Sequence, residues 1–193
     1  VSLHDVDGDK HDNITTPIEV FKCFAEDVYS SGFSLCSMAD YLRLPKEQRC
    51  KYIVCTFDDG YSGLIKNALP IMNLHGFTAT VFVCADYIGK NNDWNYKDKT
   101  TRRHLNINEL KTLQNNGWEI GSHGMTHQSL LRLNDEHLEY QLTESKRRLQ
   151  TMFGPISSYA YPYGDSNPFI ENQVKRYYDS AFLLTQGGVF LEV

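Results

Sequence analysis

Two adjacent aspartates, Asp58 and Asp59, are the first side chains in this sequence whose type and spacing suggest chemistry. They lie in the run Thr56–Gly60, directly after an apolar stretch typical of a buried strand. Neighbouring carboxylates that leave water repel each other unless a cation compensates their charge. One could therefore bind a divalent metal while the other acts as a general base. A solvated Asp-Asp-Gly turn is the alternative, and this run alone favours it.

A pair of histidines offers the remaining ligands for such a metal. His123 and His127 are four residues apart, and glycines at positions 121 and 124 predict a compact turn around them. Alone, the pair could be two surface histidines. With one aspartate it completes a set of two histidines and one carboxylate, which leaves positions open for water and substrate. Zinc in such a site lowers the pKa of its water to about 7, and the second aspartate could accept the proton as water attacks a carbonyl.

Three further residues are candidates for contact with substrate. In the turn Tyr161–Gly164, Pro162 fixes the backbone, so the N–H of Tyr163 could stabilise an oxyanion and both residues could bind substrate. An ordinary turn with a packed tyrosine is the alternative. Trp94 lies in residues 86–104, a long connection in which an aromatic ring could be a platform for a sugar. A solvated insertion is the competing interpretation.

His4 is the candidate for donating a proton to a leaving amine, because imidazole titrates near neutral pH. The alternative is a histidine that is satisfied in the mouth of a barrel.

The elements that must position these residues alternate between strand and helix. We expect strands at residues 1–4, 52–57, 78–84, 118–121, 157–161 and 180–184, and helices at residues 18–31, 62–75, 108–116, 135–153 and 169–178. Asn108 and Asp135 are expected helix N-caps, and Pro70 should kink or split its helix. This alternation predicts parallel βα units in a small or incomplete barrel, since an eightfold barrel usually needs about 250 residues.

All the polar motifs follow predicted strands, so they should converge at the carboxyl-terminal rim of this barrel. The composition is typical of an ordinary soluble globular protein, and it argues against two other classes. The formal net charge of −5 over 193 residues gives no electrostatic footprint for nucleic acid. No apolar run is long enough to cross a bilayer. Five cysteines without C-x-x-C spacing predict buried free thiols and favour a reducing compartment.

The order and spacing of Thr-Phe-Asp-Asp-Gly, Ser-His-x-x-x-His and Tyr-Pro-Tyr-Gly resemble the NodB-type polysaccharide deacetylases. This resemblance implies a distorted, incomplete (β/α) barrel and a single domain over residues 1–193, with the Val1 start allowing truncation at one or both ends. It implies a hydrolase that removes acetyl groups from a polysaccharide or oligosaccharide. N-acetyl groups of N-acetylhexosamine residues are the favoured substrate. Asp58 would be the base, and the N–H of Tyr163 would help to stabilise the oxyanion. Asp59, His123 and His127 would bind one divalent metal. Zinc is the favoured ion, and cobalt and nickel are the alternatives.

Two departures from the family pattern leave alternatives open. Ala160 replaces an arginine that orients the base, and no histidine follows His137, where the family has its general acid. Either His4 donates the proton or the donor lies beyond Val193. A glycan-binding pseudoenzyme and an amidohydrolase on a small non-sugar amide are the alternative functions. The family often works outside the cytoplasm, whereas the free thiols and the lack of a signal peptide favour a cytoplasmic location. The sequence predicts no oligomeric state.

Overall fold

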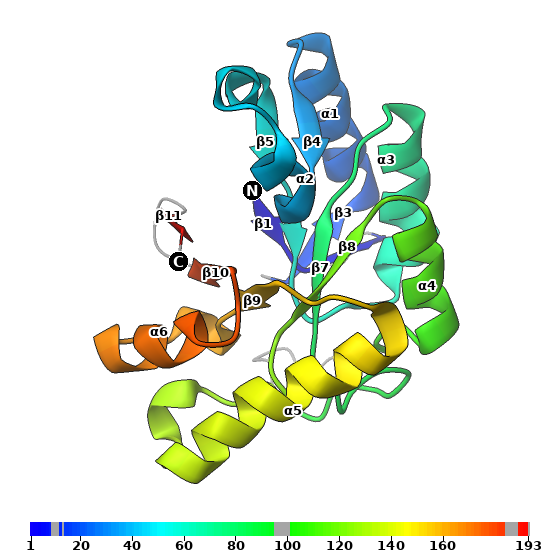
Figure 1. The fold of residues 1–193 in the computed structure, drawn as a ribbon. Helices are drawn as coiled ribbons and strands as arrows, with labels where there is room; N and C mark the ends of the chain where they lie inside the picture. Colours follow the sequence, from blue (N-terminus) through cyan, green and yellow to red (C-terminus); the bar gives the residue numbers. More distant parts are fainter. Residues whose placement is uncertain (9–11, 13, 95–100, 184–188, 193) are drawn as a thin grey trace.

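The computed structural model describes residues 1–8, 12, 14–94, 101–183 and 189–192 (Figure 1). Its centre is a seven-stranded sheet that is parallel except for its last strand, which is antiparallel to its neighbour. In spatial order the strands are β1 (Ser2–Leu3), β6 (Thr56–Phe57), β7 (Thr80–Val83), β8 (Glu119–Ser122), β9 (Ser158–Ala160), β10 (Ser180–Leu183) and β11 (Val189–Glu192). Within the described residues the two edge strands, β1 and β11, do not pair with each other. The sheet is therefore the predicted distorted and incomplete barrel.

Helices lie around the outside of this curled sheet (Figure 1). They are α1 (Ile18–Ser30), α2 (Met38–Arg43), α3 (Leu69–Leu74), α4 (Ile107–Asn115), α5 (Asp135–Phe153) and α6 (Pro168–Lys175). α4 and α5 pack against β8, and α6 packs against β10. The apolar faces of these helices and of the strands meet in one core, where Phe57 stacks on Trp118 with ring centroids 5.3 Å apart. The strands thereby gain a rigid backing on which the loops at their ends are placed.

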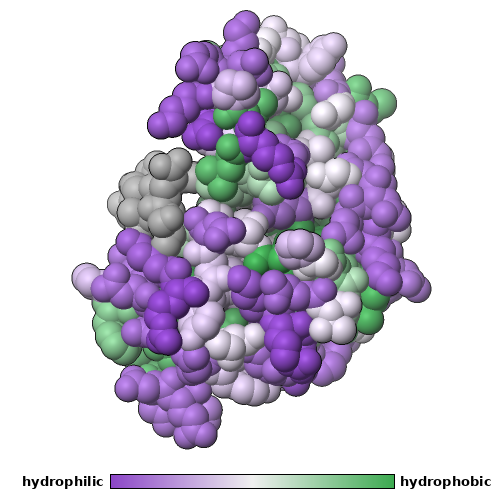
Figure 2. Space-filling view, viewed as in Figure 1, coloured by the Kyte–Doolittle hydropathy of each residue, from purple (hydrophilic) through white to green (hydrophobic). Residues whose placement is uncertain are grey.

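Polar and charged side chains cover most of the visible face of the molecule, and apolar residues gather only in small groups (Figure 2). Among the described residues, no helix has both the length and the apolar character needed to cross a membrane. All five cysteines are free. The expectation that they are buried is wrong for Cys23 and Cys50, which are exposed, because they lie on the outer surfaces of α1 and of a short 3₁₀ helix.

The predicted strand over residues 52–57 is in fact two strands of two sheets. β5 (Tyr52–Val54) pairs with β4 (Ser34–Cys36), and after Cys55 the chain continues as β6 in the central sheet. A further small pair joins β2 (Asp5–Asp7) to β3 (Thr15–Pro17). Strands of two or three residues are too short for their periodicity to be visible in the sequence.

Two helix starts differ from the expected ones. Asn106, not Asn108, caps α4, and it forms a capping box with Glu109. Asn134, not Asp135, caps α5. Pro70 was expected to kink or split its helix. A π-helical turn over Leu64–Ala68 instead passes directly into α3, and the proline occupies the first turn of α3, where its missing N–H is tolerated. None of these shifts moves a residue of the site from its strand end.

Candidate metal and active site

The Asp-Asp-Gly turn begins at the carboxyl end of β6, where the predicted rim lies. Asp58 donates its backbone N–H to the carbonyl of Leu3 at 2.9 Å, which ties the turn to β1. Both carboxylates are almost fully buried. Gly60 has a φ of +71°, and a Cβ there would lie 2.7 Å from Cγ1 of Val83. Only glycine fits this position, so the turn is held in one conformation against β7.

The histidine turn begins at the end of β8, two strands away. His123 donates its backbone N–H to the carbonyl of Val83 at 2.9 Å, and Gly124 turns the chain with a φ of +79°. His127 closes the turn with a φ of +54°. Both imidazoles are buried. The sequence expectation of a compact turn is therefore confirmed, and the spacing of four residues serves the turn and not a helix.

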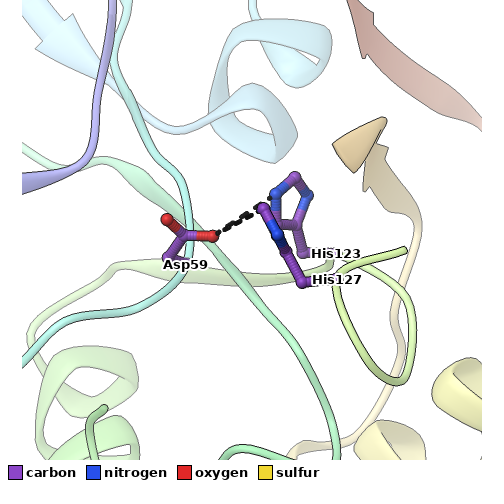
Figure 3. Close-up of side chains that lie close together, drawn as sticks. All are labelled: Asp59, His123 and His127. Carbon is purple, nitrogen blue, oxygen red and sulfur yellow. Dashed lines mark ion pairs between the residues drawn. The ribbon is translucent and has the colours of Figure 1, made fainter. Parts of the chain in front are cut away.

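The two turns bring Asp59, His123 and His127 together (Figure 3). Oδ1 of Asp59 lies 3.6 Å from Nε2 of His123 and 3.1 Å from Nε2 of His127. One ligand atom from each residue lies within 4.8 Å of the other two, and all three side chains are buried. The cluster contains no residue outside the predicted metal set.

The donor atoms of this cluster fit a divalent metal. Nδ1 of His123 lies 2.8 Å from the carbonyl of Ala160, and because a carbonyl only accepts, Nδ1 carries the proton. Nε2 therefore offers its lone pair toward Asp59, as metal-ligating histidines do when a backbone carbonyl orients them. A tetrahedral zinc ion would hold its ligand atoms about 3.3 Å apart, close to the two distances seen here.

The charges at the site also suit a metal. Burial lowers the pKa of His123 to about 3, and repulsion from His127 adds to this effect, so His123 is neutral at neutral pH. Burial alone would raise the pKa of Asp59, but His127 and His123 hold it well below its usual range. The site thus presents an ionised carboxylate beside a neutral imidazole, which are the protonation states that metal ligands require.

Asp58 lies beside this cluster with a different charge state. Burial raises its pKa to about 6, while the nearby His4 opposes the rise and Asp59 adds to it. A carboxyl with such a pKa can accept a proton near neutral pH. The structure thus separates the two neighbouring aspartates, one fully ionised among imidazoles and one poised to titrate.

Tyr163 and Trp94 lie on two sides of His127. The ring of Trp94 stacks on the imidazole at 4.3 Å with an interplanar angle of 18°, whereas Tyr163 meets it edge-on at 4.6 Å. Trp94 thus lines the candidate metal site, and one face of its ring is covered by the imidazole of His127. Pro162 is buried at the end of β9, and the half-exposed ring of Tyr163 follows it. The neighbouring Tyr96 lies outside the described residues.

Backbone strain is concentrated at this site. Among the described non-glycine residues, positive φ angles occur only at Asp59, His127 and Tyr163, at +67°, +54° and +62°. Such left-handed conformations cost about 1–2 kcal/mol for residues with a Cβ. They persist only where the surrounding structure holds them. All three belong to the residues that the sequence motifs predicted for the site.

Two residues that hold the site were not predicted. Gln141, buried on α5, accepts from the backbone N–H of Met125 at 2.8 Å and of Thr126 at 3.3 Å, and donates to the hydroxyl of Thr126 at 2.8 Å. His104 lies beside the backbone of Asp59. Gln141 faces the core side of an otherwise amphipathic helix, and that misplaced polar residue was a usable signal. The sequence gives no comparable signal for His104.

We expect Gln141→Met to weaken metal binding about tenfold, because Gln141 clamps the turn between the two histidines. Methionine keeps the length of the side chain but leaves two backbone N–H groups without their acceptor, at about 1–3 kcal/mol each if they stay buried. Zinc affinity and thermal unfolding of the metal-free protein measure the two effects separately. Gln150→Met, at an exposed position of the same helix, is the matched control. If Gln141→Met lowers the stability but leaves zinc affinity unchanged, Gln141 does not position the histidine turn for metal binding.

The fold and the site together define the class of this protein. The family model for polysaccharide deacetylase matches residues 45–178, a span that includes both motifs of the candidate metal site, and the chain belongs to that family. The expected resemblance is thereby confirmed.

Individual relatives agree with this assignment. The chain is 24% identical over 159 residues to Bacillus subtilis (strain 168) YxkH, whose description places it provisionally among the polysaccharide deacetylases; the match covers 80% of this chain and 53% of YxkH. The polysaccharide deacetylase BC0361 from Bacillus cereus has the same fold, with a TM-score of 0.81 and 21% identity over 100% of this chain and 59% of that one. The Streptococcus pyogenes deacetylase PplD has this fold as well, with a TM-score of 0.78 and 18% identity; the match covers 92% of this chain and 78% of PplD. The chain spans little more than half the length of YxkH and BC0361.

Proposed function

We propose that this protein is a metal-dependent hydrolase that removes acetyl groups from a carbohydrate, with N-acetylhexosamine residues as the first candidates. The observation that carries the proposal is the buried cluster of Asp59, His123 and His127 with a second carboxylate, Asp58, beside it. A glycan-binding protein would have no use for this extra buried carboxylate. Membership of the polysaccharide deacetylase family supports the same activity.

The residues divide the work as follows. A divalent metal held by the cluster would polarise the acetyl carbonyl and make water more acidic. Asp58 accepts the proton of the attacking water, for which its raised pKa of about 6 is suited. The backbone N–H of Tyr163 stabilises the oxyanion that develops on the carbonyl oxygen. His4 directly follows β1, to which the backbone of Asp58 is hydrogen-bonded, and donates a proton to the leaving nitrogen.

Release of acetate from N-acetylglucosamine oligomers tests the proposal. The protein is stripped with a chelator, and zinc or cobalt is added back at one equivalent. A parallel reaction on acetylated xylan separates N-acetyl from O-acetyl preference. Release that appears only with metal supports the hydrolase. One bound metal without release from either substrate would favour a glycan-binding role, and failure to bind metal would contradict the proposed site.

The role of His4 predicts a dependence on the leaving group. We expect His4→Gln to slow hydrolysis of an N-acetyl amide about 100-fold, since the amine must be protonated as it leaves. Hydrolysis of an activated aryl acetate should change little, because a phenolate leaves without a proton. Steady-state rates on both substrates provide the comparison, and His137→Gln, at an exposed position, is the control. Equal losses on amide and ester would exclude His4 as the acid.

A further inference from the structure

The segment Arg102–Leu105 lies directly against the Asp-Asp-Gly turn. Leu105 donates its backbone N–H to the carbonyl of Gly60 at 2.8 Å, and Ser62 donates to the carbonyl of Arg103 at 2.9 Å. The same segment is also hydrogen-bonded to residues 89–92: His104 donates its backbone N–H to the carbonyl of Lys90 at 2.8 Å. The competing expectation of a solvated insertion is thus wrong for this part of the long connection, because its backbone is hydrogen-bonded on both sides.

Two ion pairs anchor this segment. Arg102 is buried and contacts the carboxylate of Asp12 at 2.6 Å, which ties the segment to the chain after β2. Arg103 and Glu109 are joined by two hydrogen bonds of 2.7 and 2.8 Å, which tie it to α4. A two-bonded pair such as that of Arg103 and Glu109 fixes orientation as well as distance. The segment can therefore act as a fixed support for the turn beside it.

His104 is the side chain by which this support reaches the site. Its Nδ1 lies 2.8 Å from the backbone carbonyl of Asp59, and because that carbonyl only accepts, Nδ1 donates. The imidazole is buried and contacts the rings of Tyr61 and Trp94, with centroids 4.8 and 5.1 Å away. These ring contacts restrict the orientation in which the imidazole holds its hydrogen bond.

The carbonyl that His104 holds belongs to a strained residue. Asp59 has a φ of +67°, a conformation that survives only where neighbours enforce it. The same backbone conformation sets the direction of the Asp59 side chain, whose Oδ1 faces both imidazoles. A bond that fixes the peptide of Asp59 thus also fixes where its carboxylate points.

We propose that His104 is a positioning residue, which holds the backbone of Asp59 so that its carboxylate is oriented for metal binding. The inference rests on the metal site of the proposed function. The hydrogen bond of His104 goes to the backbone carbonyl of Asp59 and not to its carboxylate, so its effect passes through the peptide bond after Asp59. Partners of this kind typically change metal affinity by about 10–100-fold.

Three substitutions separate the hydrogen bond from packing. In His104→Asn the amide nitrogen stands as many bonds from Cα as Nδ1 does, so the donor is kept. His104→Phe keeps a flat ring without the donor. His104→Gln places its amide nitrogen one bond too far, and serves if the phenylalanine variant does not fold. His137→Phe, at an exposed position, is the control.

The readouts are zinc affinity by competition with a chelator, the visible spectrum of the cobalt-loaded protein, and thermal unfolding of the metal-free protein. We expect His104→Phe and His104→Gln to bind zinc about 10–100-fold more weakly with an altered cobalt spectrum, and His104→Asn to stay within about threefold of wild type.

Wild-type affinity in the phenylalanine or glutamine variant, or an equal loss in the asparagine variant, would overturn the positioning role while leaving the metal site intact. Failure of the wild-type protein to bind metal would instead overturn the proposed function and this inference with it.

Discussion

Asp59→Asn is expected to abolish tight metal binding while leaving the protein folded. The substitution removes the only carboxylate of the three-residue cluster but keeps its size, and asparagine tolerates the left-handed backbone at this position. Loss of a direct ligand should exceed the 10–100-fold effect of an outer partner, so we expect at least about 100-fold weaker zinc binding. Chelator competition measures it, and Asp27→Asn, at an exposed position on α1, is the control.

Thermal unfolding gives an independent view of the same change. A metal that binds only the folded state at 100 times its Kd stabilises it by about 2.7 kcal/mol. We expect zinc to raise the Tm of wild type and of Asp27→Asn but not that of Asp59→Asn. An Asp59→Asn protein that zinc still stabilises would show that the ligand set has been assigned wrongly.

Asp58→Asn is expected to separate catalysis from metal binding. The substitution removes the carboxylate that we propose as the general base, and positioned bases contribute about 100- to 10,000-fold to such rates. We expect kcat for acetate release to fall by that amount, while zinc affinity stays near that of wild type. The control is again Asp27→Asn. A variant that loses zinc together with activity would indicate that Asp58, too, is a ligand.

The same substitution should stabilise the metal-free protein in a defined pH window. Burial raises the pKa of Asp58 from 3.8 to about 6 on folding, so the folded state disfavours the ionised form. The penalty is absent below about pH 4, grows between pH 4 and 6, and is complete above pH 6, where it amounts to about 3 kcal/mol at most. Urea unfolding of both proteins at pH 4 and 7 measures the gain of Asp58→Asn, which should appear only at pH 7. An equal gain at both values would assign it to packing.

The sequence was most informative where chemistry and chain order coincide. The motifs around Asp58 and His123 are continuous in sequence and follow buried strands, so the rule that parallel strands end at one rim was enough to place them together. The contacts that orient the metal ligands could not be predicted, because they come from other parts of the chain. The carbonyl of Ala160 orients His123 from β9, and Gln141 clamps the histidine turn from α5. Such contacts depend on tertiary packing. The polar Gln141 on the core side of its helix was a usable signal, but the helical pattern does not name the backbone groups that it binds.

The errors in the fold have the same origin. The stretch from 52 to 57 is apolar except for Thr56, and nothing in its composition marks Cys55 as the point where the chain passes from one sheet to another. Asn106 and Asn108 are both plausible caps, and only the reciprocal bond with Glu109 decides between them. The path of the segment Arg102–Leu105 was open for another reason. Its hydrogen bonds to residues 59–62 join parts of the chain that are distant in sequence and form no regular strand there.

The three left-handed residues place this site in conflict with selection for heat resistance. Glycine adopts such backbone angles without steric cost, so at Asp59, His127 or Tyr163 it relieves strain in the folded chain. A mutant library screened for melting temperature alone should therefore enrich glycine at the positions that the proposed activity can least spare. Engineering of a more robust variant of this protein should leave these three codons fixed and seek its gains on the outer helices.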